Sequence, residues 1–329
     1  MLCYPAQAVH VAQIERSLAE SSIDAVVIDA GQERVAEELL SADIYCGHAK
    51  VPVDWDAVVA RGRLRWIQSS AAGMDHCLTP AVVDSKIAVT SASGLLADQV
   101  AEQTLALLLG CLRSLPTFFA AQRAREFVRR PTRDLHGCRV GIVGLGGNGR
   151  RLVEVLRPFR PSIVATDWFP TQPPAGVDSV HAPEELDSLL PEIDVLLLTP
   201  PLTDATRGLI NARRISLLPQ GATLINVARG PIVVEDALVD ALRSGHLAGA
   251  GVDVTEVEPL PAESRLWDAP NCLITPHVGG QAAWRLDRMT DFFCDNLSRF
   301  FANRPMRNRV EKSLGFPTPG NAAWAIDAL

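Results

Sequence analysis

The sequence is poor in lysine: Lys50, Lys86 and Lys312 are the three lysines of a 329-residue chain. None of them lies in a motif described below, which argues against Schiff-base chemistry because that chemistry needs an active-site lysine. The seven cysteines are scattered, and none forms a C-x-x-C pair. A disulfide framework or a structural zinc site is therefore not expected, no metal site is predicted, and a reducing compartment, the cytoplasm, fits best.

Long apolar runs and excess positive charge are also lacking. The most apolar stretch, LALLLGCL at 105–112, is far shorter than the ~20 residues of a membrane span and is followed by Arg113, so we expect a core helix and no membrane partner. The first residues lack a basic segment, and Glu15 and Arg16 interrupt them, so no signal peptide is expected. A net charge of −7 and a pI near 5.5 argue against nucleic acid as a partner.

What the sequence does contain is an alternation of short apolar runs with helix-length amphipathic stretches, which is typical of βαβ units and a parallel sheet. A first array has predicted strands at 24–30, 42–48, 64–69 and 86–91 and a helix at 32–40. A long helix at 95–115 and an arginine-rich segment at 121–137 follow. A second array then has about six strands, near 139–143, 162–167, 193–199, 222–227, 248–253 and 272–275. The last predicted helix is 282–304.

A glycine fingerprint opens the second array. Gly144, Gly146 and Gly149 form G-x-G-x-x-G between a β-branched strand and an amphipathic helix, which is the context that makes this otherwise weak motif informative. The first glycine allows a tight turn, the second lets the backbone approach a pyrophosphate, and the third lets the helix pack close to the strand. The phosphates would lie at the helix N-terminus, whose N–H groups are unpaired.

The next predicted strand, SIVATD, ends at Asp167, 18 residues after Gly149. A carboxylate at this distance accepts hydrogen bonds from the ribose hydroxyls of NAD and repels the additional phosphate of NADP. The alternative is an aspartate that merely starts a turn. Together with the glycines, Asp167 favours NAD as the cofactor.

The later strands end in residues that are unusual at the tip of a core strand. In an open parallel sheet the carboxyl ends of the strands form the ligand crevice. A guanidinium at such a tip, in INVARG, is either a surface arginine at the start of a loop or a ligand-binding group. The residues at or just beyond the strand ends are Thr199 with Pro200 and Pro201, Arg229, Asp253 with Glu258 in the following loop, and His277.

Five motifs in this order resemble the D-isomer-specific 2-hydroxyacid dehydrogenases. They are GIVGLGGNGR, TPPLTDATRGLIN, INVARG, GVDVTEVEPLP and TPHVGG, and the resemblance is dense from about residue 95 to 290. It implies an α/β protein of two domains, a Rossmann dinucleotide-binding domain inserted into a flavodoxin-like substrate domain. The expected boundaries are 1–98 plus 289–329 for the substrate domain and 99–288 for the NAD-binding domain.

The resemblance also implies roles. His277 would be the general acid that protonates the carbonyl of a 2-oxo acid as hydride arrives, and the base in the reverse direction. Glu258 would hydrogen-bond His277 and fix the tautomer of its ring. Arg229 would bind the carboxylate and carbonyl oxygens of the substrate with its planar fork. The loop SSAAGMDH (69–76) would bind the substrate carboxylate through the backbone N–H groups of Ala72 and Gly73.

The remaining implied contacts are with NAD. Asp253 would face the nicotinamide carboxamide, and the other residues at cofactor positions are Thr199, Pro200, Thr206, Ala228 and Gly279. The family forms dimers through the region after the long helix, here roughly 100–137, so a homodimer is expected. Two departures concern substrate size and dimer detail: Thr255 stands where many relatives carry an aromatic residue, and 121–137 lacks a common tryptophan, with Phe127 nearby.

The predicted function is therefore hydride transfer between NAD(H) and C2 of a small 2-hydroxy or 2-oxo acid, such as glyoxylate, hydroxypyruvate or pyruvate. An alternative from another class is a non-catalytic NAD-sensing protein of the same fold, similar to a transcriptional corepressor. A formate- or phosphite-oxidising relative is a third reading, for which the sequence shows no identifiable pocket residues. The sequence does not identify the side chain of the substrate or the preferred direction of the reaction.

Overall fold

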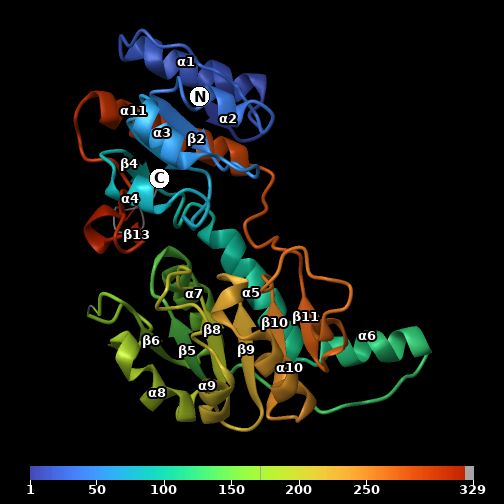
Figure 1. The fold of residues 1–329 in the computed structure, drawn as a ribbon. Helices are drawn as coiled ribbons and strands as arrows, with labels where there is room; N and C mark the ends of the chain where they lie inside the picture. The colour runs from blue at the N-terminus through green and yellow to red at the C-terminus, as the bar shows by residue number, and fades with distance from the viewer. Residues whose placement is uncertain (171, 323–329) are drawn as a thin grey trace. The chain divides into compact units, whose positions relative to one another are not determined.

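The computed structural model describes residues 1–170 and 172–322 (Figure 1). The chain divides into two compact units, Met1–Leu96 with Ala282–Leu329, and Ala97–Gln281. We call them the four-stranded unit and the seven-stranded unit. These limits differ from the expected 98/99 and 288/289 by two and seven residues. The C-terminal tail from Gly315 is rich in proline and glycine, and its last residues, 323–329, lie outside the described residues.

The four-stranded unit contains a parallel sheet in the order β1-β2-β3-β4, and Asp29 forms a parallel bridge to Leu2 beyond β1. With that segment counted, the spatial order is 2-1-3-4-5, the flavodoxin-like order. The strands are β1 (Leu2–Cys3), β2 (Ile44–Gly47), β3 (Trp66–Ser69) and β4 (Ala88–Thr90). The helices are α1 (Ala8–Glu20), α2 (Val35–Glu38), α3 (Trp55–Arg61), α4 (Pro80–Asp84) and α11 (Arg285–Phe301), and a short hairpin joins β12 (Val310–Glu311) to β13 (Phe316–Pro317).

Helices cover both faces of this sheet because successive side chains of a strand point to opposite faces. Ile67 packs on one face in a core with residues of α2, α3 and α4. Trp66, the preceding residue, packs on the other face with residues of α1 and α11, including Phe293. The C-terminal helix is therefore a structural part of the four-stranded unit.

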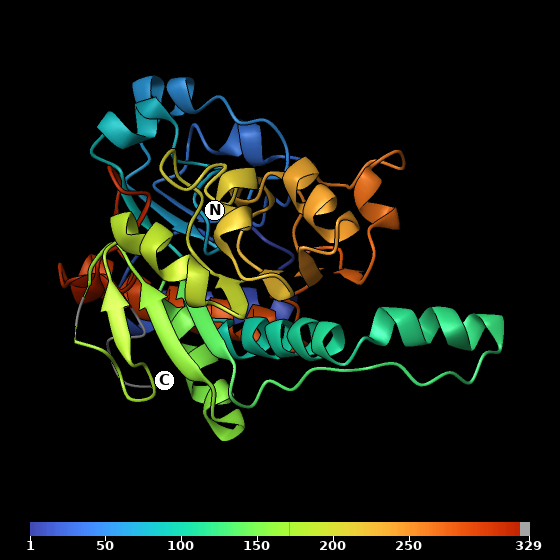
Figure 2. The same ribbon diagram turned by 90° about the horizontal axis from the view of Figure 1, so that it is seen from below.

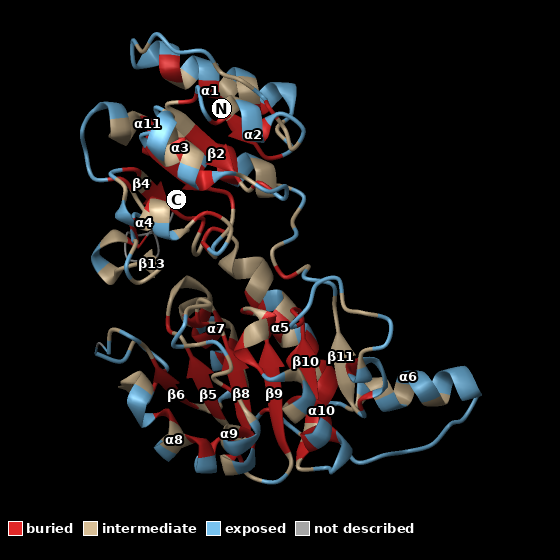
Figure 3. Ribbon diagram, viewed as in Figure 1, coloured by how far each residue is buried: buried red, intermediate tan, exposed pale blue. Residues whose placement is uncertain are grey.

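The seven-stranded unit has one parallel sheet in the order β11-β10-β9-β8-β5-β6-β7, the Rossmann order 3-2-1-4-5-6 with one strand added at the far edge. The predicted fold class is confirmed. The strands are β5 (Arg139–Val143), β6 (Ser162–Thr166), β7 (Ser179–His181), β8 (Val195–Leu198), β9 (Ala222–Asn226), β10 (Leu247–Val252) and β11 (Cys272–Ile274). The residues of β5, β6, β8, β9 and β10 are mostly buried, whereas those of the edge strands β7 and β11 are only partly buried (Figure 3).

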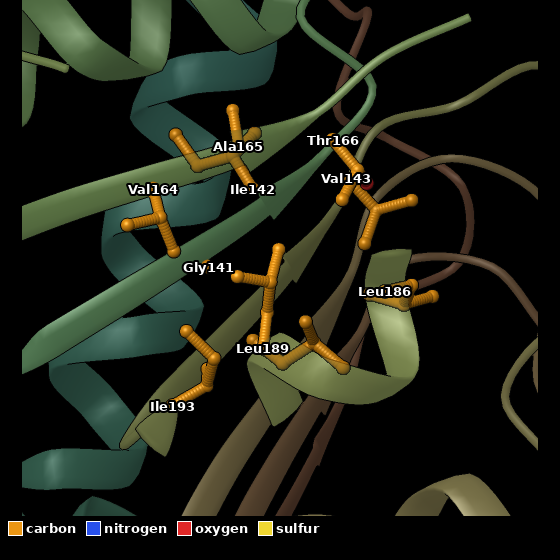
Figure 4. Close-up of a pocket in the computed structure, with 10 residues that line it drawn as sticks. Gly141, Ile142, Val143, Val164, Ala165, Thr166, Leu186, Leu189 and Ile193 are labelled. Carbon is orange, nitrogen blue, oxygen red and sulfur yellow. The ribbon is translucent and has the colours of Figure 1, made fainter. Parts of the chain in front are cut away.

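Two layers of helices enclose this sheet. One face packs in a core with α5 (Ala97–Leu112) and α7 (Gly147–Leu156), and the other with α8 (Leu186–Leu189), α9 (Ala212–Leu217) and α10 (Glu235–Arg243). A cavity of about 10 Å³ lies between the strands β5, β6 and β8 and the helix α8, and it is lined by apolar side chains such as Leu186, Leu189 and Ile193 (Figure 4). A cavity this small with an apolar lining stays dry, so it is a packing defect and not a ligand site.

An arm projects from the seven-stranded unit. It consists of α6 (Leu115–Ala124) and the extended segment 125–134, and Figure 2 shows it leading away from the sheet. No residue of α6 is buried, and Phe127 is fully exposed. Within residues 1–170 and 172–322, no single helix has the length and apolar character needed to cross a bilayer; α5 and α6 meet that test only when joined across a 65° bend.

The structure differs from the sequence-based expectation at two edge strands. The run 24–30 was expected to be a strand, but it contributes a single bridge at Asp29, and β1 at Leu2–Cys3 was not predicted. The edge strand β7 was also missed, because its three residues are only partly buried and include Ser179 and His181. The second array therefore has seven strands instead of six.

Candidate active site

The glycine turn between β5 and α7 has the geometry that its three glycines imply. Gly144 has φ +89°, and a Cβ there would lie 2.9 Å from the Cα of Pro200. A Cβ on Gly149 would lie 2.2 Å from the carbonyl oxygen of Gly144, so this glycine permits close packing of helix and strand. A Cβ on Gly146 would meet no heavy atom within 4 Å. Protein packing therefore does not require glycine at 146, and open space remains where a pyrophosphate would approach.

Asp167 lies at the end of β6, beside this turn. One carboxylate oxygen accepts the N–H of Leu145 at 2.7 Å, and the other accepts the N–H of Phe169 at 2.9 Å. The carboxylate thus fixes the residue between Gly144 and Gly146. Each oxygen retains a second lone pair, so the group can still accept hydrogen bonds from the hydroxyls of a ribose.

The loop after β8 is held by two threonine hydroxyls. The Oγ1 of Thr199 donates to the carbonyl oxygen of Gly144 at 2.6 Å and so ties this loop to the glycine turn. The Oγ1 of Thr206 donates to the carbonyl of Pro201 at 2.7 Å and accepts the N–H of Thr203 at 2.8 Å. Both predicted cofactor residues therefore shape the loop that flanks the fingerprint.

Arg229 follows β9 in a turn that the buried Asn226 organises. The side chain of Asn226 donates to the carbonyl of Arg229 at 3.0 Å and accepts the N–H of Ala228 at 3.1 Å. Gly230 packs so closely on the next loop that a Cβ there would lie 1.8 Å from the carbonyl oxygen of Thr255. The INVARG motif therefore fixes the backbone from which the guanidinium extends, and Arg229 Nη1 donates to the carbonyl of Ala228 at 2.8 Å.

His277 and Glu258, which are 19 residues apart in the sequence, form a direct contact. The Nδ1 of His277 lies 2.8 Å from an Oε atom of Glu258, while the other Oε atom accepts the N–H of Thr255 at 3.2 Å. The two side chains are 46% and 39% exposed, so this pair is accessible to a ligand. Because Nδ1 faces a carboxylate, it carries the ring proton, and Nε2 is the atom able to exchange a proton with a ligand.

Asp253 is buried, and its carboxylate organises the segment that carries His277. One oxygen accepts from the Oγ1 of Thr275 at 2.6 Å and from the N–H of Val278 at 3.0 Å; the other accepts the N–H of Gly279 at 2.7 Å. The N–H of His277 also donates to the carbonyl of Asp253 at 2.7 Å. A Cβ on Gly279 would lie 2.8 Å from the Asp253 carboxylate. The segment 275–279 is thus wrapped around one carboxylate.

The loop after β3, in the four-stranded unit, presents backbone N–H groups. Ala71 is fixed at both ends of its backbone, because its N–H donates to Ser69 Oγ at 3.0 Å and its carbonyl accepts the N–H of Ala92 at 3.0 Å. Within the described residues, the N–H groups of Ala72 and Gly73 make no hydrogen bond to the protein. Ala72 is exposed, so these donors are available to an anionic ligand such as a carboxylate.

His76 ends this loop and has a structural role. Its Nε2 lies 3.3 Å from Ser69 Oγ, and its ring stacks on that of His48 with centroids 4.0 Å apart. The stacked rings thus connect this loop to the residue that follows β2.

Three residues that shape the site lie in the motifs quoted above without a predicted role of their own, namely Asn226 and Gly230 in INVARG and Thr275 in TPHVGG. One of them had a detectable signal, since an asparagine at the end of a buried apolar strand needs hydrogen-bond partners there. In the part of the chain that the structure describes, no group of three or more His, Cys, Asp or Glu side chains could hold a metal ion.

The model for the NAD binding domain of D-isomer specific 2-hydroxyacid dehydrogenases matches residues 105–279. A Corynebacterium melassecola protein encoded in the proB 3′ region is 35% identical over 302 residues, 90% of this chain and 96% of the relative. A glyoxylate reductase from Thermofilum pendens is 33% identical over 256 residues, 74% of each chain. A solved D-isomer specific 2-hydroxyacid dehydrogenase from Xanthobacter autotrophicus, in complex with NADPH and MES, has a TM-score of 0.78 at 31% identity, covering 96% of this chain and 99% of that one.

Proposed function

Because the chain belongs to the D-isomer-specific 2-hydroxyacid dehydrogenase family, a family of NAD-linked oxidoreductases, we propose that it reduces a small 2-oxo acid with NADH. Glyoxylate, hydroxypyruvate and pyruvate are the proposed substrates, and glyoxylate has the additional support of the similar glyoxylate reductase. The observation that carries the proposal is the hydrogen bond of 2.8 Å between His277 and Glu258. It joins an acid/base group to the carboxylate that orients it, at the edge of the sheet where a dinucleotide fold binds its ligand.

The residues fit the cofactor. The open space at Gly146, the N-terminus of α7 and the carboxylate of Asp167 are suited to the pyrophosphate and the ribose of NAD. When bound, NADH supplies the hydride that reduces C2 of the substrate. In this proposal Thr199, Pro200, Thr206 and Ala228 line the cofactor site, and Asp253 and Gly279 act mainly by holding the 275–279 segment in place.

The protein residues have separate tasks in the reaction. His277, protonated at Nε2, donates that proton to the carbonyl oxygen of the substrate, and takes a proton from the hydroxyl in the reverse direction. Glu258 keeps the Nδ1 proton of His277 in place and stabilises the charged ring. Arg229 binds the substrate carboxylate and polarises the carbonyl, and the N–H groups of Ala72 and Gly73 are further carboxylate donors.

The decisive experiment is a screen of NADH oxidation over a panel of 2-oxo acids that differ in side chain. Turnover of at least one of them at a rate typical of enzymes, on the order of 1 s⁻¹ or more, supports the proposal and rejects the non-catalytic NAD-sensing alternative. Tight NADH binding without turnover of any member of the panel would favour that alternative.

Coenzyme preference is a separate prediction, because the similar Xanthobacter structure contains NADPH. We expect NADH to be preferred by about a hundredfold or more in kcat/KM, because a carboxylate facing the 2′-phosphate is a like-charge contact that costs several kcal/mol, and each 1.4 kcal/mol is tenfold. Asp167→Ser should narrow this gap mainly by admitting NADPH, and steady-state kinetics with both coenzymes would measure it.

A matched control for this prediction is Asp178→Ser. The carboxylate of Asp178 also accepts a backbone N–H, that of Ile163 at 3.1 Å, but it lies beside β7 and away from the fingerprint. This control should leave the ratio between the coenzymes unchanged. Equal use of NADH and NADPH by the unmodified protein would show that Asp167 does not contact the ribose.

We also propose that the protein is a homodimer formed through the arm. Leu115, Phe119, Phe127 and Val128 expose 37%, 50%, 103% and 40% of their surface there, and exposed apolar surface beyond scattered single residues is typical of interaction sites. The expected molar mass in solution is twice the 35.5 kDa of the chain, measured by light scattering after gel filtration. Phe127→Glu should shift it toward the monomer, whereas Val26→Glu, at a site that is 83% exposed in the four-stranded unit, should not.

The cytoplasm remains our proposal for the compartment. All seven cysteines are free, and burial raises the pKa of the Cys77, Cys111 and Cys272 thiols to about 12. Such neutral thiols are poor nucleophiles and metal ligands. Imaging of a fluorescent fusion in the native host would test this placement.

A further inference from the structure

A chain of buried polar side chains runs from α11 through β3 to the loop 69–73, all within the four-stranded unit. Its members Gln68, Thr90 and Asn296 are each 0% exposed. Buried polar groups are costly unless they are hydrogen-bonded, and a network of them fixes one arrangement only when its groups are satisfied. Helix α11 and the end of β3 are more than 200 residues apart in sequence, so this series of buried side chains connects two distant parts of the polypeptide.

The orientation of the Gln68 amide is determined by its neighbours. Its Oε1 accepts two hydrogen bonds, from Thr90 Oγ1 at 2.8 Å and from Asn296 Nδ2 at 3.0 Å. Asn296 is fixed in turn, since its amide donates to the carbonyl of Arg307 at 3.1 Å and accepts the N–H of Arg307 at 2.8 Å. Because two donors face Oε1, the amide cannot flip, and Nε2 must point to the carbonyl of Ser69, to which it donates at 3.0 Å.

This contact fixes the first peptide plane of the loop. In a planar trans peptide the C=O and the following N–H point in opposite directions. Holding the carbonyl of Ser69 therefore orients the N–H of Ser70, which donates to the carbonyl of Gly47 at the end of β2 at 3.1 Å. The end of β3 is thus held from both sides of one peptide plane.

The side chain of Ser69 also constrains the peptide planes on both sides of Ala71. The hydroxyl of Ser69 donates to the carbonyl of Ala71 at 3.1 Å and accepts its N–H at 3.0 Å. With the carbonyl of Ala71 held in this way, the N–H of Ala72 must point away from the protein interior. This direction is the one that a carboxylate-binding donor needs.

We propose that Gln68 and Asn296 are positioning residues for substrate binding, which act by orienting the backbone N–H group of Ala72, next to that of Gly73, toward the carboxylate of the substrate. The inference rests on the proposed function, because it assigns those N–H groups to the substrate. Neither side chain touches a ligand. Their contribution is preorganisation, which avoids the free-energy cost of ordering the loop when the substrate binds.

The test compares Gln68→Met, which keeps the length of the side chain and removes its hydrogen bonds, with Thr290→Val. Thr290 is also 0% exposed on α11, and its hydroxyl lies 3.0 Å from that of Tyr4 and donates to the carbonyl of Leu286 at 2.8 Å, so the hydrogen bonds of this side chain involve no residue of the loop. Both variants lose buried hydrogen bonds, so thermal unfolding should show comparable losses of stability. Only Gln68→Met should raise KM for the 2-oxo acid, by about 10- to 100-fold, and both should keep the affinity for NADH.

Amide hydrogen exchange supplies a readout that does not depend on catalysis. In Gln68→Met the amides of 70–74 should exchange at least tenfold faster than in the unmodified protein, whereas Thr290→Val should leave them unchanged. Asn296→Ala should reproduce the effect. The double variant should change KM and the exchange rates no more than Gln68→Met does, because the effects of residues in one hydrogen-bond network are not additive. If Gln68→Met does not fold, Asn296→Ala measured alone decides the question.

The outcomes separate the two proposals. If Gln68→Met and Asn296→Ala change exchange and KM no more than Thr290→Val does, the positioning role is wrong although the enzyme functions as proposed. If the unmodified protein turns over no 2-oxo acid, the proposed function fails, and the exchange rates still decide whether Gln68 orders the loop. Faster exchange with an unchanged KM would also overturn the proposal, since the ordered N–H groups would then not serve the substrate.

Discussion

Replacing His277 with asparagine is expected to lower turnover of the 2-oxo acid by roughly 10²- to 10⁴-fold, the usual contribution of a positioned acid/base group. Asparagine can retain a hydrogen bond to Glu258, but it has no group that can give up a proton near neutral pH. NADH binding should persist, because the proposed cofactor contacts lie on other residues. Stopped-flow measurement of hydride transfer, with NADH titrations monitored by fluorescence, would separate the two effects.

The matched control is His246→Asn. His246 lies between α10 and β10, where its Nε2 contacts the carbonyl of Ile215 at 2.9 Å, and it has no place in the proposed reaction. Turnover should be retained in this variant apart from any loss of folded protein. A His277→Asn enzyme with a rate close to that of the unmodified protein would contradict the acid/base assignment.

The second large effect is expected for Arg229→Lys. A lysine keeps the positive charge but offers a single ammonium in place of a planar fork, so it cannot bind carboxylate and carbonyl oxygens side by side. We expect kcat/KM for any 2-oxo acid to fall by about 10²- to 10³-fold, similar to the loss of one donor from an oxyanion site, with little change in the affinity for NADH. Steady-state kinetics and NADH titration on the purified variant would test this.

Arg214→Lys is the control for this substitution. Arg214 uses its fork structurally, donating to Asp187 at 2.7 Å and to the carbonyl of Leu209 at 3.0 Å. Its replacement should lower stability and leave kcat/KM of the folded enzyme nearly unchanged. If Arg229→Lys weakened only the binding of NADH, Arg229 would belong to the cofactor site and not to the substrate.

The sequence predicted those parts of the fold that depend on local periodicity. The central strands β5, β6, β8, β9 and β10 are apolar runs bounded by turn residues, and each was placed within a few residues. Edge strands have weaker signals because their side chains are only partly buried, as in β7 and β11. The three-residue strand β7 was therefore not predicted. The apolar run 24–30 was predicted as a strand, but it contributes only the bridge at Asp29.

The site was predictable to the extent that its residues follow strand ends. The contact between His277 and Glu258 was expected and is present at 2.8 Å. What the sequence could not supply is the orientation of each group. The three donors gathered by Asp253 come from a segment more than 20 residues away, and the partner of Gln68 on α11 is 228 positions further along the chain. Pairings of this kind are fixed by the tertiary fold.

The wrapping of 275–279 around one carboxylate has a practical consequence for altering the substrate range by mutagenesis. Neither Asp253 nor Gly279 can be replaced alone. A Cβ at 279 would lie 2.8 Å from the carboxylate of Asp253, and without that carboxylate the hydroxyl of Thr275 and the N–H groups of Val278 and Gly279 would lose their acceptor. The neighbouring positions Glu256 and Val257 are exposed and face no such steric limit, although the side chain of Glu256 accepts the N–H of Glu235 at 3.4 Å. A library that randomises 256 and 257 while keeping 253 and 279 fixed should therefore retain a high fraction of folded, active members.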